Sequence, residues 1–366
     1  MRRFSQAFAA AASLKWNCTA AGAILAPMKV AVYSTKPYDQ RFLDAANSAH
    51  RHSLHFLEPR LDRHTAPLAA GYQAVCVFVN DLLDAPTLEA LAQGGTRIVA
   101  LRCAGFNNVD LAVAERLGIA VVRVPAYSPH AVAEFSIGLL LALDRRIPRA
   151  WARVRENNFA LEGLIGRNLH GRTVGVVGTG RIGALVARSL CAGFGCNVLA
   201  SDIAEDEELK QLGVRYVPLA DLIGASEIIT LHCPLTPETH HLINRDSLAN
   251  ARDGLILVNT SRGALTDTRA LIAGLKSRKL GGVALDVYEQ EADLFFEDLS
   301  SEIIEDDDFQ RLLTFPNVLI TGHQAFLTEE ALTSIAETTL QSLTDAEAGK
   351  PLTNAVIAEA VLRPRS

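Results

Sequence analysis

The sequence predicts an α/β protein built from two doubly wound parallel-sheet domains, the second of which is inserted into the first. Three observations predict this class. The 366 residues are enough for about two domains. Short apolar strands alternate with helices in two successive runs, a pattern typical of parallel sheets covered on both faces. After the last strand only one helical segment remains, and it is too short to form a domain of its own.

The first run of strands and helices starts at Met28 and ends near residue 127. Its expected strands are short stretches rich in Val, Ile and Leu: KVAVYST, SLHFLE, YQAVCVFV, TRIVALRCAG and IAVVRVP. Between them lie helical stretches such as DAPTLEALAQGG, which begins with Asp and ends with Gly.

A long helix follows over residues 128–147. Ser128 and Pro129 are suited to its start, and Pro148 interrupts it. Because its sequence is apolar nearly all round, we expect it to be buried, between the domains or between subunits.

The second run extends from Arg172 to His323. Its expected strands are RTVGVVG, NVLASD, VRYV, EIITLHC, GLILVNT, GVALDVY and NVLITG. The final helix, TEEALTSIAETTLQSLTDAEAG, is expected to pack on the first domain. The predicted boundaries are therefore 28–128 and 325–366 for the discontinuous domain, and 129–324 for the inserted one.

Composition argues against several kinds of partner. The net charge of −6, from 35 basic and 41 acidic residues, gives no basic excess for nucleic acid. No apolar run reaches the roughly 18 residues that a membrane-spanning helix needs. The six cysteines form no C-x-x-C pair, so we expect reduced thiols in a cytoplasmic protein rather than disulfides or a zinc site. No metal ligand set is predicted.

The first 27 residues differ from the rest of the chain. They hold Arg2, Arg3 and Lys15 and no acidic residue, which is compatible with a targeting peptide. The alternative is an upstream start codon or an added tail, which we favour because Met28 opens a clean strand, MKVAVYST. In either case the segment is expected to be disordered and to lie outside the fold.

A glycine-rich turn, GTGRIG, follows the first strand of the second run and opens a helix. Gly178 permits the tight turn, Gly180 lets the backbone approach a pyrophosphate, and Gly183 lets the helix pack on the strand. The helix N-terminus then offers free N–H groups to the phosphates. The alternative is a glycine turn packed for its own sake.

An acidic residue, Asp202, ends the second strand, 22 residues beyond Gly180. A carboxylate there accepts hydrogen bonds from the ribose hydroxyl of NAD and repels the 2′-phosphate of NADP. The spacing therefore predicts NAD as cofactor. The alternative role for Asp202 is to cap the next helix.

Polar side chains follow three later strands of the second run. These residues are Ser261 and Arg262, then Asp286, Glu289 and Glu291, and finally His323. The carboxyl ends of parallel strands lie at one edge of a sheet, where ligands bind. An arginine fork matches carboxylate or carbonyl oxygens, a histidine exchanges protons near neutral pH, and a nearby carboxylate orients its protonated ring. Taken singly, each is also compatible with a surface Arg, an acidic loop or a strand-end His.

Other polar features receive simpler interpretations. Six histidines lie on polar segments expected to be exposed: His50, His52, His55, His64, His240 and His241. Three more show no comparable partners: His130, His170 and His232. Residues 289–308 contain ten acidic residues and no basic one, so most of this segment is expected to be a solvated surface insertion.

From Met28 nearly to its C-terminus the sequence resembles the D-isomer-specific 2-hydroxyacid dehydrogenases, most closely the fermentative D-lactate dehydrogenases of Gram-negative bacteria. The stretches that carry the resemblance are MKVAVYSTKPYD, ALRCAGFNNVDL, VRVPAYSPHAVAE, GVVGTGRIG, LHCPLTPETHHLIN, VNTSRGAL, DVYEQEADLFFED and TGHQAFLTEEALTSIAETTL. DLFFED and GHQAFLT point to the lactate subgroup. The chain departs at Phe135, where many relatives have His, and at Ile203 and Ala204, where relatives often have Pro-Tyr.

The resemblance implies a fold and a set of roles. A Rossmann NAD-binding domain is inserted in a flavodoxin-like substrate domain. Arg262 orients the substrate, and Glu291 pairs with His323, the acid/base. Backbone N–H groups of Ala104 and Gly105, together with Tyr127, bind substrate. Besides the three glycines, the residues implied for NAD are Arg181, Ile182, Asp202, Cys233, Pro234, Thr260, Ser261, Arg262 and Asp286.

The function expected from this resemblance is reversible reduction of pyruvate to D-lactate by NADH. One alternative is a related reductase of glyoxylate, hydroxypyruvate or phenylpyruvate. The other is an NAD-sensing binding protein without turnover. The buried helix over 128–147 suggests a homo-oligomer, either a dimer or a tetramer.

Overall fold

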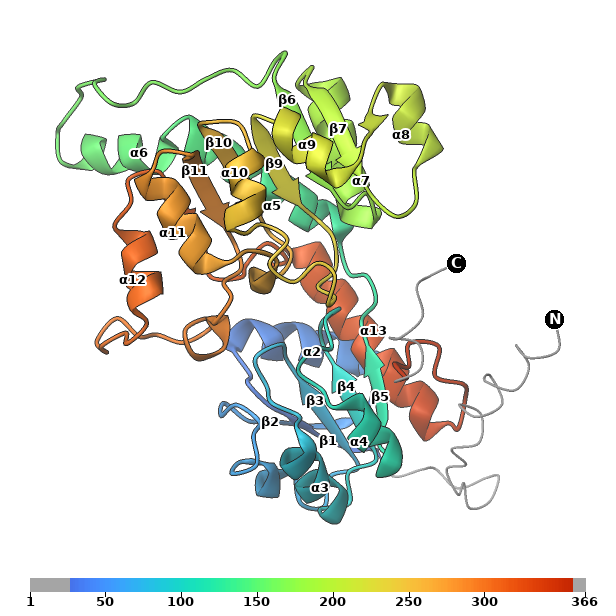
Figure 1. Cartoon of the computed structure of the whole chain (residues 1–366). Helices are drawn as coiled ribbons and strands as arrows, with labels where there is room; N and C mark the ends of the chain where they lie inside the picture. The colour runs from blue at the N-terminus through green and yellow to red at the C-terminus, as the bar shows by residue number, and fades with distance from the viewer. Residues whose placement is uncertain (1–26, 358–366) are drawn as a thin grey trace. The chain divides into compact units, whose positions relative to one another are not determined.

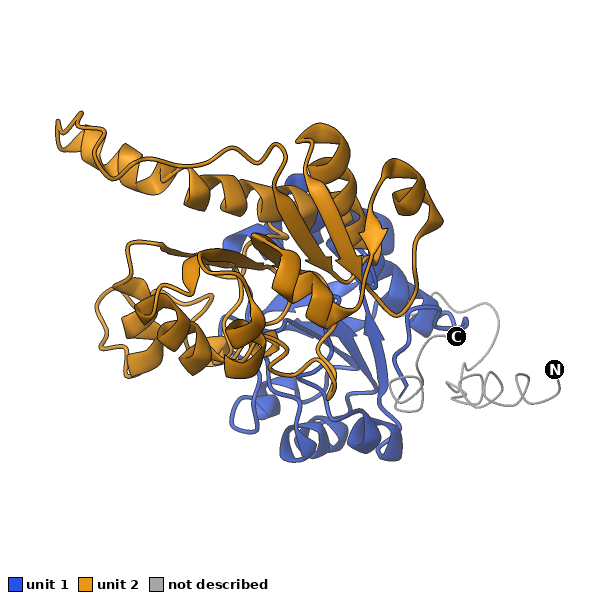
Figure 2. Ribbon diagram, turned by 45° about the horizontal axis from the view of Figure 1, so that its top comes forward, with its two compact units in different colours: residues 1–128, 328–366 blue, residues 129–327 orange. Residues whose placement is uncertain are grey.

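The computed structural model describes residues 27–357, coloured along the chain in Figure 1. The prediction of a disordered N-terminal segment concerns residues outside this range, apart from residue 27. The chain divides into two compact units, shown in two colours in Figure 2. Unit 1 comprises residues 1–128 and 328–366, and unit 2 comprises residues 129–327. No helix within 27–357 is long and apolar enough to cross a membrane.

Unit 1 contains a five-stranded parallel sheet in the order β2-β1-β3-β4-β5. The strands are β1 (Lys29–Val32), β2 (Ser53–Phe56), β3 (Ala74–Val77), β4 (Ile98–Leu101) and β5 (Ala120–Arg123). Each lies within a predicted stretch and is shorter than it. The order reverses between β1 and β3, which is the switch point of a doubly wound sheet.

Helices cover the sheet of unit 1. They are α2 (Pro37–His50), η1 (Ala66–Ala69), α3 (Ala85–Gln93), α4 (Leu111–Arg116) and α13 (Glu329–Glu347). The last helix starts where Thr328 accepts a hydrogen bond from the Ala331 N–H, as an N-cap does. Its apolar face, including Leu340 and Leu343, packs beside α2 on the strand residues of this sheet.

Unit 2 contains a seven-stranded parallel sheet in the order β12-β11-β10-β9-β6-β7-β8. The strands are β6 (Thr173–Val177), β7 (Asn197–Ser201), β8 (Arg215–Tyr216), β9 (Ile228–Leu231), β10 (Leu255–Asn259), β11 (Leu280–Leu285) and β12 (Val318–Ile320). All seven predicted strands are present, and the switch point falls between β6 and β9. The predicted fold class, with two doubly wound parallel sheets, is confirmed.

The helices of unit 2 lie on both sides of its sheet (Figure 1). They are α5 (Pro129–Asp144), α6 (Ile147–Arg155), α7 (Arg181–Arg188), η2 (Ser189–Gly193), α8 (Glu207–Leu212), α9 (Leu219–Ala225), α10 (Arg245–Asn250), η3 (Gly263–Leu265), α11 (Thr268–Lys276), η4 (Glu291–Asp293) and α12 (Asp307–Leu313). The predicted long helix starts at Pro129 but ends at Asp144, earlier than expected. Arg146 adopts a left-handed conformation with φ of +56°, which breaks the helix before Pro148.

Candidate active site

The glycine-rich turn links β6 to α7 at the switch point of unit 2. Gly178 has φ of +87°, and a Cβ there would lie 2.6 Å from the Cys233 nitrogen. A Cβ on Gly183 would lie 1.9 Å from the Gly178 oxygen, so the helix can approach the strand only with glycine at this position. Gly180, the N-cap of α7, faces open space, with no atom within 4 Å of the position of its Cβ. This geometry leaves room for a pyrophosphate at Gly180.

Asp202 supports this turn directly. Its Oδ2 accepts hydrogen bonds from the backbone N–H and hydroxyl of Thr179, and its Oδ1 accepts one from the Ala204 N–H at 3.2 Å. Tyr216 donates to the Thr179 hydroxyl at 2.9 Å. The helix cap that was the alternative role for Asp202 is made instead by Asp206, at the start of α8. Asp202 is partly exposed, so its remaining lone pairs can accept a ribose hydroxyl.

The loops after β9 and β10 are tied together beside the turn. The Ser261 hydroxyl donates to the Cys233 carbonyl at 2.8 Å, and the Thr260 and Ser136 hydroxyls are hydrogen-bonded at 2.6 Å. Burial raises the pKa of Cys233 to about 11, so its thiol is neutral at physiological pH. Arg181 and Pro234 are exposed at this edge.

Arg262 is held by a turn that the sequence interpretation did not anticipate. Asn259, fully buried at the end of β10, accepts from the Ser261 N–H at 3.0 Å and donates to the Arg262 carbonyl at 2.8 Å. The Arg262 Nη1 donates to the Ser261 carbonyl at 2.6 Å. The signal available in the sequence was a single polar residue at the end of the apolar stretch LILVN.

A second glycine contact brings this turn against the segment after β11. A Cβ on Gly263 would lie 2.1 Å from the carbonyl carbon and oxygen of Tyr288 and 2.4 Å from the nitrogen of Glu289. Only glycine fits without displacing one backbone or the other. Arg262 and the acidic residues after β11 are thereby fixed close together.

His323 and Glu291 form the expected pair. The His323 Nδ1 lies 2.8 Å from the Glu291 Oε1, while the Glu291 Oε2 accepts a hydrogen bond from the Tyr288 N–H at 2.9 Å. The His323 side chain is 17% exposed and that of Glu291 is 23% exposed. The His323 Nε2 makes no hydrogen bond within residues 27–357, so it is available to a ligand. One nitrogen is therefore oriented by a carboxylate and the other is free, as an acid/base requires.

Comparisons with known proteins point to one enzyme family. Residues 137–325 match the family described as D-isomer specific 2-hydroxyacid dehydrogenase, NAD binding domain. A 2-hydroxyacid dehydrogenase homolog from Zymomonas mobilis is 54% identical over 331 residues, covering 90% of this chain and 100% of that protein.

Solved structures give the same result. The apo-structure of D-lactate dehydrogenase from Escherichia coli is 49% identical, with a TM-score of 0.82, over 90% of this chain and 100% of that one. D-lactate dehydrogenase from Aquifex aeolicus, complexed with NAD and lactic acid, is 33% identical, with a TM-score of 0.80, over 90% and 99% of the two chains.

The chain belongs to the D-isomer-specific 2-hydroxyacid dehydrogenase family. It is an NAD-dependent oxidoreductase, and the prediction of NAD as cofactor is confirmed. The open space at Gly180 and the partly exposed carboxylate of Asp202 suit this cofactor.

In this dehydrogenase Asp286 organises the loop that carries His323. Asp286 is fully buried, and its Oδ1 accepts from the Thr321 hydroxyl at 2.6 Å and the Gln324 N–H at 2.9 Å. Its Oδ2 accepts from the Ala325 N–H at 2.8 Å. Burial raises the pKa of Asp286, while these hydrogen bonds oppose the shift. The role of Asp286 beside the nicotinamide stays a prediction, whereas its bonds to the His323 loop were not anticipated.

Most residues of the acidic segment 289–308 are exposed, as expected, but two phenylalanines are not. Phe295 is buried and contacts Phe309, with ring centroids 6.1 Å apart. Phe296 has φ of +71°, and its ring lies 5.7 Å from that of His323. The two phenylalanines therefore turn inward although most of their neighbours are charged. One aromatic side chain of this segment, Phe296, therefore lies beside His323, which the charge pattern did not indicate.

The substrate residues predicted in unit 1 follow β4 and β5. Among the described residues, the backbone N–H groups of Ala104 and Gly105 donate no hydrogen bond. Arg123 donates to the Ala104 carbonyl at 2.7 Å and so holds this loop. The two free N–H groups leave unit 1 with donors for an anion.

Some predicted exposures are wrong. His52 is 5% exposed, because it packs against α13 and its Nε2 lies 3.0 Å from the Thr344 hydroxyl. His50, on α2, is partly buried and contacts the same hydroxyl at 2.8 Å. The polar neighbours of these histidines in the sequence gave no sign of α13, which lies almost 300 residues later.

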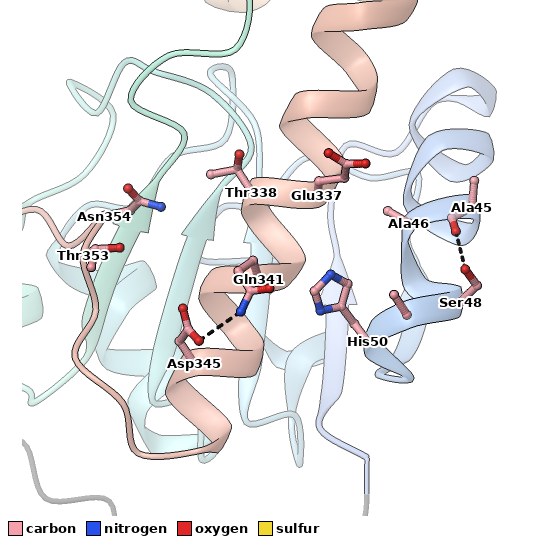
Figure 3. Close-up of a pocket in the computed structure, with 11 residues that line it drawn as sticks. Ala45, Ala46, Ser48, His50, Glu337, Thr338, Gln341, Asp345, Thr353 and Asn354 are labelled. Atoms are coloured by element: carbon pink, nitrogen blue, oxygen red, sulfur yellow. Dashed lines mark hydrogen bonds between the residues drawn. The ribbon is translucent and has the colours of Figure 1, made fainter.

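A pocket of about 600 Å³ lies between α2 and α13 in unit 1, as Figure 3 shows. His50, Glu337 and Asp345 are among its lining residues. None of the predicted site residues lines it, so we assign it no part in the reaction.

Proposed function

We propose that this dehydrogenase catalyses the reversible reduction of pyruvate to D-lactate, with His323 as the acid/base. The observation that carries the proposal is the His323–Glu291 pair, with Nδ1 held at 2.8 Å and Nε2 free. Relatives named D-lactate dehydrogenase support the choice of substrate.

The chain's own residues supply the proton and the orientation. In the reducing direction, the protonated His323 donates its Nε2 proton to the substrate carbonyl oxygen. Glu291 holds Nδ1 and fixes the plane of the ring. Arg262 directs its remaining N–H groups to the substrate oxygens and stabilises the negative charge that develops there. Bound NADH supplies the hydride that reduces the carbonyl carbon.

We further propose that the free N–H groups of Ala104 and Gly105 bind the substrate carboxylate, and that Tyr127 contacts the substrate. Two adjacent backbone donors suit an anionic carboxylate. Substitution of Tyr127 by Phe should raise the KM for pyruvate more than it lowers kcat, because the role is one of binding.

The experiment that tests the substrate is an NADH oxidation assay with the purified protein. Pyruvate, glyoxylate, hydroxypyruvate and phenylpyruvate are compared by kcat/KM. We expect the highest value for pyruvate and a product of D configuration. A higher value for another 2-oxoacid would identify a different reductase of this family, and no turnover with any of them would indicate an NAD-binding protein.

We also propose that the dehydrogenase is a homo-oligomer that associates through the segment from α6 to residue 165. This segment exposes large apolar side chains, namely Trp151 at 63%, Phe159 at 69%, Leu161 at 76% and Ile165 at 89%. Sedimentation velocity should give a dimer or a tetramer. The double substitution Phe159→Asp and Leu161→Asp should yield a monomer, and an unchanged sedimentation coefficient would exclude this segment.

A cytoplasmic location is part of the same proposal. The five cysteines within residues 27–357 form no disulfide with one another, which suits a reducing compartment. Fractionation of cells that produce the protein, with lactate-forming activity as the readout, tests this location.

A further inference from the structure

We propose that His240, His241 and Glu289 form a binding site for one divalent transition-metal ion, for which Zn²⁺ is the best chemical match. The proposed reaction uses none of these residues. They are also the one group of three or more potential metal ligands that converge within the described part of the chain.

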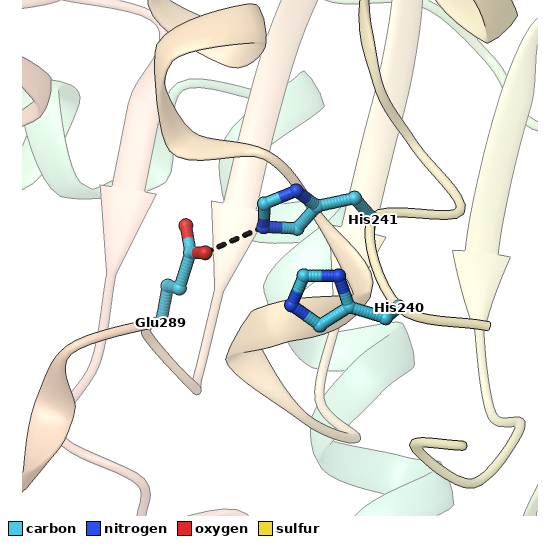
Figure 4. Close-up of side chains that lie close together, drawn as sticks. All are labelled: His240, His241 and Glu289. Carbon is cyan, nitrogen blue, oxygen red and sulfur yellow. Dashed lines mark hydrogen bonds and ion pairs between the residues drawn. The ribbon is translucent and has the colours of Figure 1, made fainter. Parts of the chain in front are cut away.

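The three side chains come from two separate loops of unit 2, as Figure 4 shows. The His241 Nε2 lies 2.5 Å from the Glu289 Oε1. The His240 ring stacks on that of His241, with centroids 4.0 Å apart. One ligand atom from each residue lies within 4.8 Å of the other two.

Two of the three ligands are already held in place. The other carboxylate oxygen of Glu289 accepts from the Thr268 hydroxyl at 3.0 Å. The backbone of His241, with φ of +49°, donates to the Ala264 carbonyl at 2.8 Å. A hydroxyl donated to a ligating carboxylate is the outer-shell contact that orients metal ligands in proteins. His240 is exposed and can rotate to complete the set.

The donor set decides which ions fit. Two imidazoles and one carboxylate suit Zn²⁺, Co²⁺, Ni²⁺ or Cu²⁺, whereas Mg²⁺ and Ca²⁺ prefer oxygen ligands alone. In a tetrahedral zinc site, bond lengths of about 2.0–2.2 Å place ligand atoms roughly 3.3 Å apart. The ion would therefore widen the present His241–Glu289 contact by about 1 Å. Water would occupy the fourth position.

The competing explanation is that the His241–Glu289 ion pair only fastens the loop after β9 to the end of β11. An ion pair needs no third residue. The geometry points to a metal because the His240 ring contributes a third donor, although its side chain makes no hydrogen bond among the described residues. His240 is therefore the residue that separates the two explanations.

The test uses the full-length protein after treatment with a chelator. Zn²⁺ is titrated by calorimetry, and Co²⁺ is titrated by its visible absorption, which reports the ligand type. We expect one ion per chain. His240→Gln should weaken binding at least about tenfold and leave NADH oxidation in metal-free buffer unchanged. The matched variant His64→Gln, at an exposed histidine of unit 1, should bind like the unmodified protein.

Several outcomes would overturn the proposal. One is equal affinity in H240Q and the unmodified protein. Another is the absence of stoichiometric binding. A thiolate charge-transfer band with Co²⁺ would assign the ion to cysteine. Loss of binding in H323Q but not in H240Q would assign it to the His323–Glu291 pair.

Discussion

Both units contain a doubly wound parallel sheet, but different residues follow the carboxyl ends of their strands. In unit 1 several of these residues are buried charged side chains. Arg102 donates to Asp39 at 3.2 Å and to the Ser34 carbonyl at 2.8 Å. Asp81 accepts from the Ser34 hydroxyl and the Leu61 N–H, both at 2.7 Å. Arg102 and Asp81 are each only 1% exposed, so buried ions fill this part of the edge, beside the free N–H groups of Ala104 and Gly105.

In unit 2 the corresponding edge is opened by glycines. Gly178 and Gly183 bring backbones together, and Gly180 leaves space in front of the helix. The topology of a sheet thus fixes where a ligand can bind. The residues that follow each strand decide whether protein side chains fill that place or leave it open to a ligand. Substitutions at the unit 2 site should therefore affect activity first, and those of the buried ions in unit 1 should affect stability first.

The largest expected effect is on turnover, from His323→Gln. Loss of the proton donor should lower kcat for pyruvate about 10³-fold, within the range for removal of an acid/base. The free energy of unfolding and the Kd for NADH should change little. Stopped-flow kinetics measures kcat, and fluorescence titration measures the Kd for NADH. Near-normal turnover would refute the role assigned to His323.

The counterpart in unit 1 is Arg102→Met. It leaves Asp39 and Asp81 without their buried cation and should cost roughly 3–5 kcal/mol in the free energy of unfolding. Urea denaturation measures it. The control is Arg116→Met, which breaks an exposed pair with Glu89 at 3.2 Å and should cost less than about 1 kcal/mol. Equal losses of unfolding free energy in the two variants would show that the buried ions of unit 1 contribute no more than an exposed pair.

Gly263→Ala should affect both properties. The new Cβ overlaps the Tyr288 backbone at 2.1 Å, so the Arg262 turn must move. We expect a loss of about 1–3 kcal/mol in stability and a larger proportional fall in kcat/KM for pyruvate. Gly224→Ala is the matched control, because its nearest atom would lie at an ordinary 3.7 Å. A fully active G263A protein would show that this contact does not position Arg262.

Glu291→Gln tests the pair. The amide carries no charge, so it should hold the His323 ring at Nδ1 less firmly than the carboxylate does. We expect kcat for pyruvate to fall, but by less than in His323→Gln, while the Kd for NADH stays unchanged. Stopped-flow turnover and fluorescence titration of NADH measure these two quantities. An unchanged kcat would mean that Glu291 does not position the ring.

The smallest expected effect concerns His232, behind the glycine turn. Burial lowers the pKa of His232 from 6.5 to about 4. Between these values the unfolded chain binds a proton that the folded chain does not, so stability falls as pH drops from 6.5 to 4. The slope should be at most about 1.4 kcal/mol per pH unit.

His232→Gln should remove this contribution to the pH dependence of Tm, and His64→Gln should keep it. Superimposable Tm curves for H232Q and the unmodified protein would show that His232 is not held neutral by the fold.

The strands and the cofactor turn were predictable because each rests on local chemistry. An apolar run such as LILVN predicts a buried strand by its own composition. The turn after β6 requires glycine at position 178, because the backbone there has φ of +87°. The features that were missed depend on partners far along the chain. Asp286 bonds to Gln324, 38 residues later, and His52 is buried by a helix near the C-terminus.

The charge pattern of the acidic segment gave no sign of the contact between Phe296 and His323 for a related reason. Glu297 and Asp298 follow Phe296 in the sequence, and only the folded chain shows that its ring lies beside that of His323. Similarly, the role of Asn259 follows only from the structure, in which its side chain is hydrogen-bonded to the backbone of Ser261 and Arg262. The composition of a segment predicts the environment of most of its residues. It does not predict that of single residues, such as Phe296, whose character differs from that of the segment.

His323 has a left-handed backbone, with φ of +52°, a conformation that is uncommon for residues other than glycine. Such a conformation costs of order 1 kcal/mol or more and persists only when its surroundings enforce it. Here Asp286 provides that enforcement, since its carbonyl accepts from the His323 N–H at 2.7 Å and its carboxylate holds the next two residues. The proposed proton donor is therefore oriented by the fold before any substrate binds.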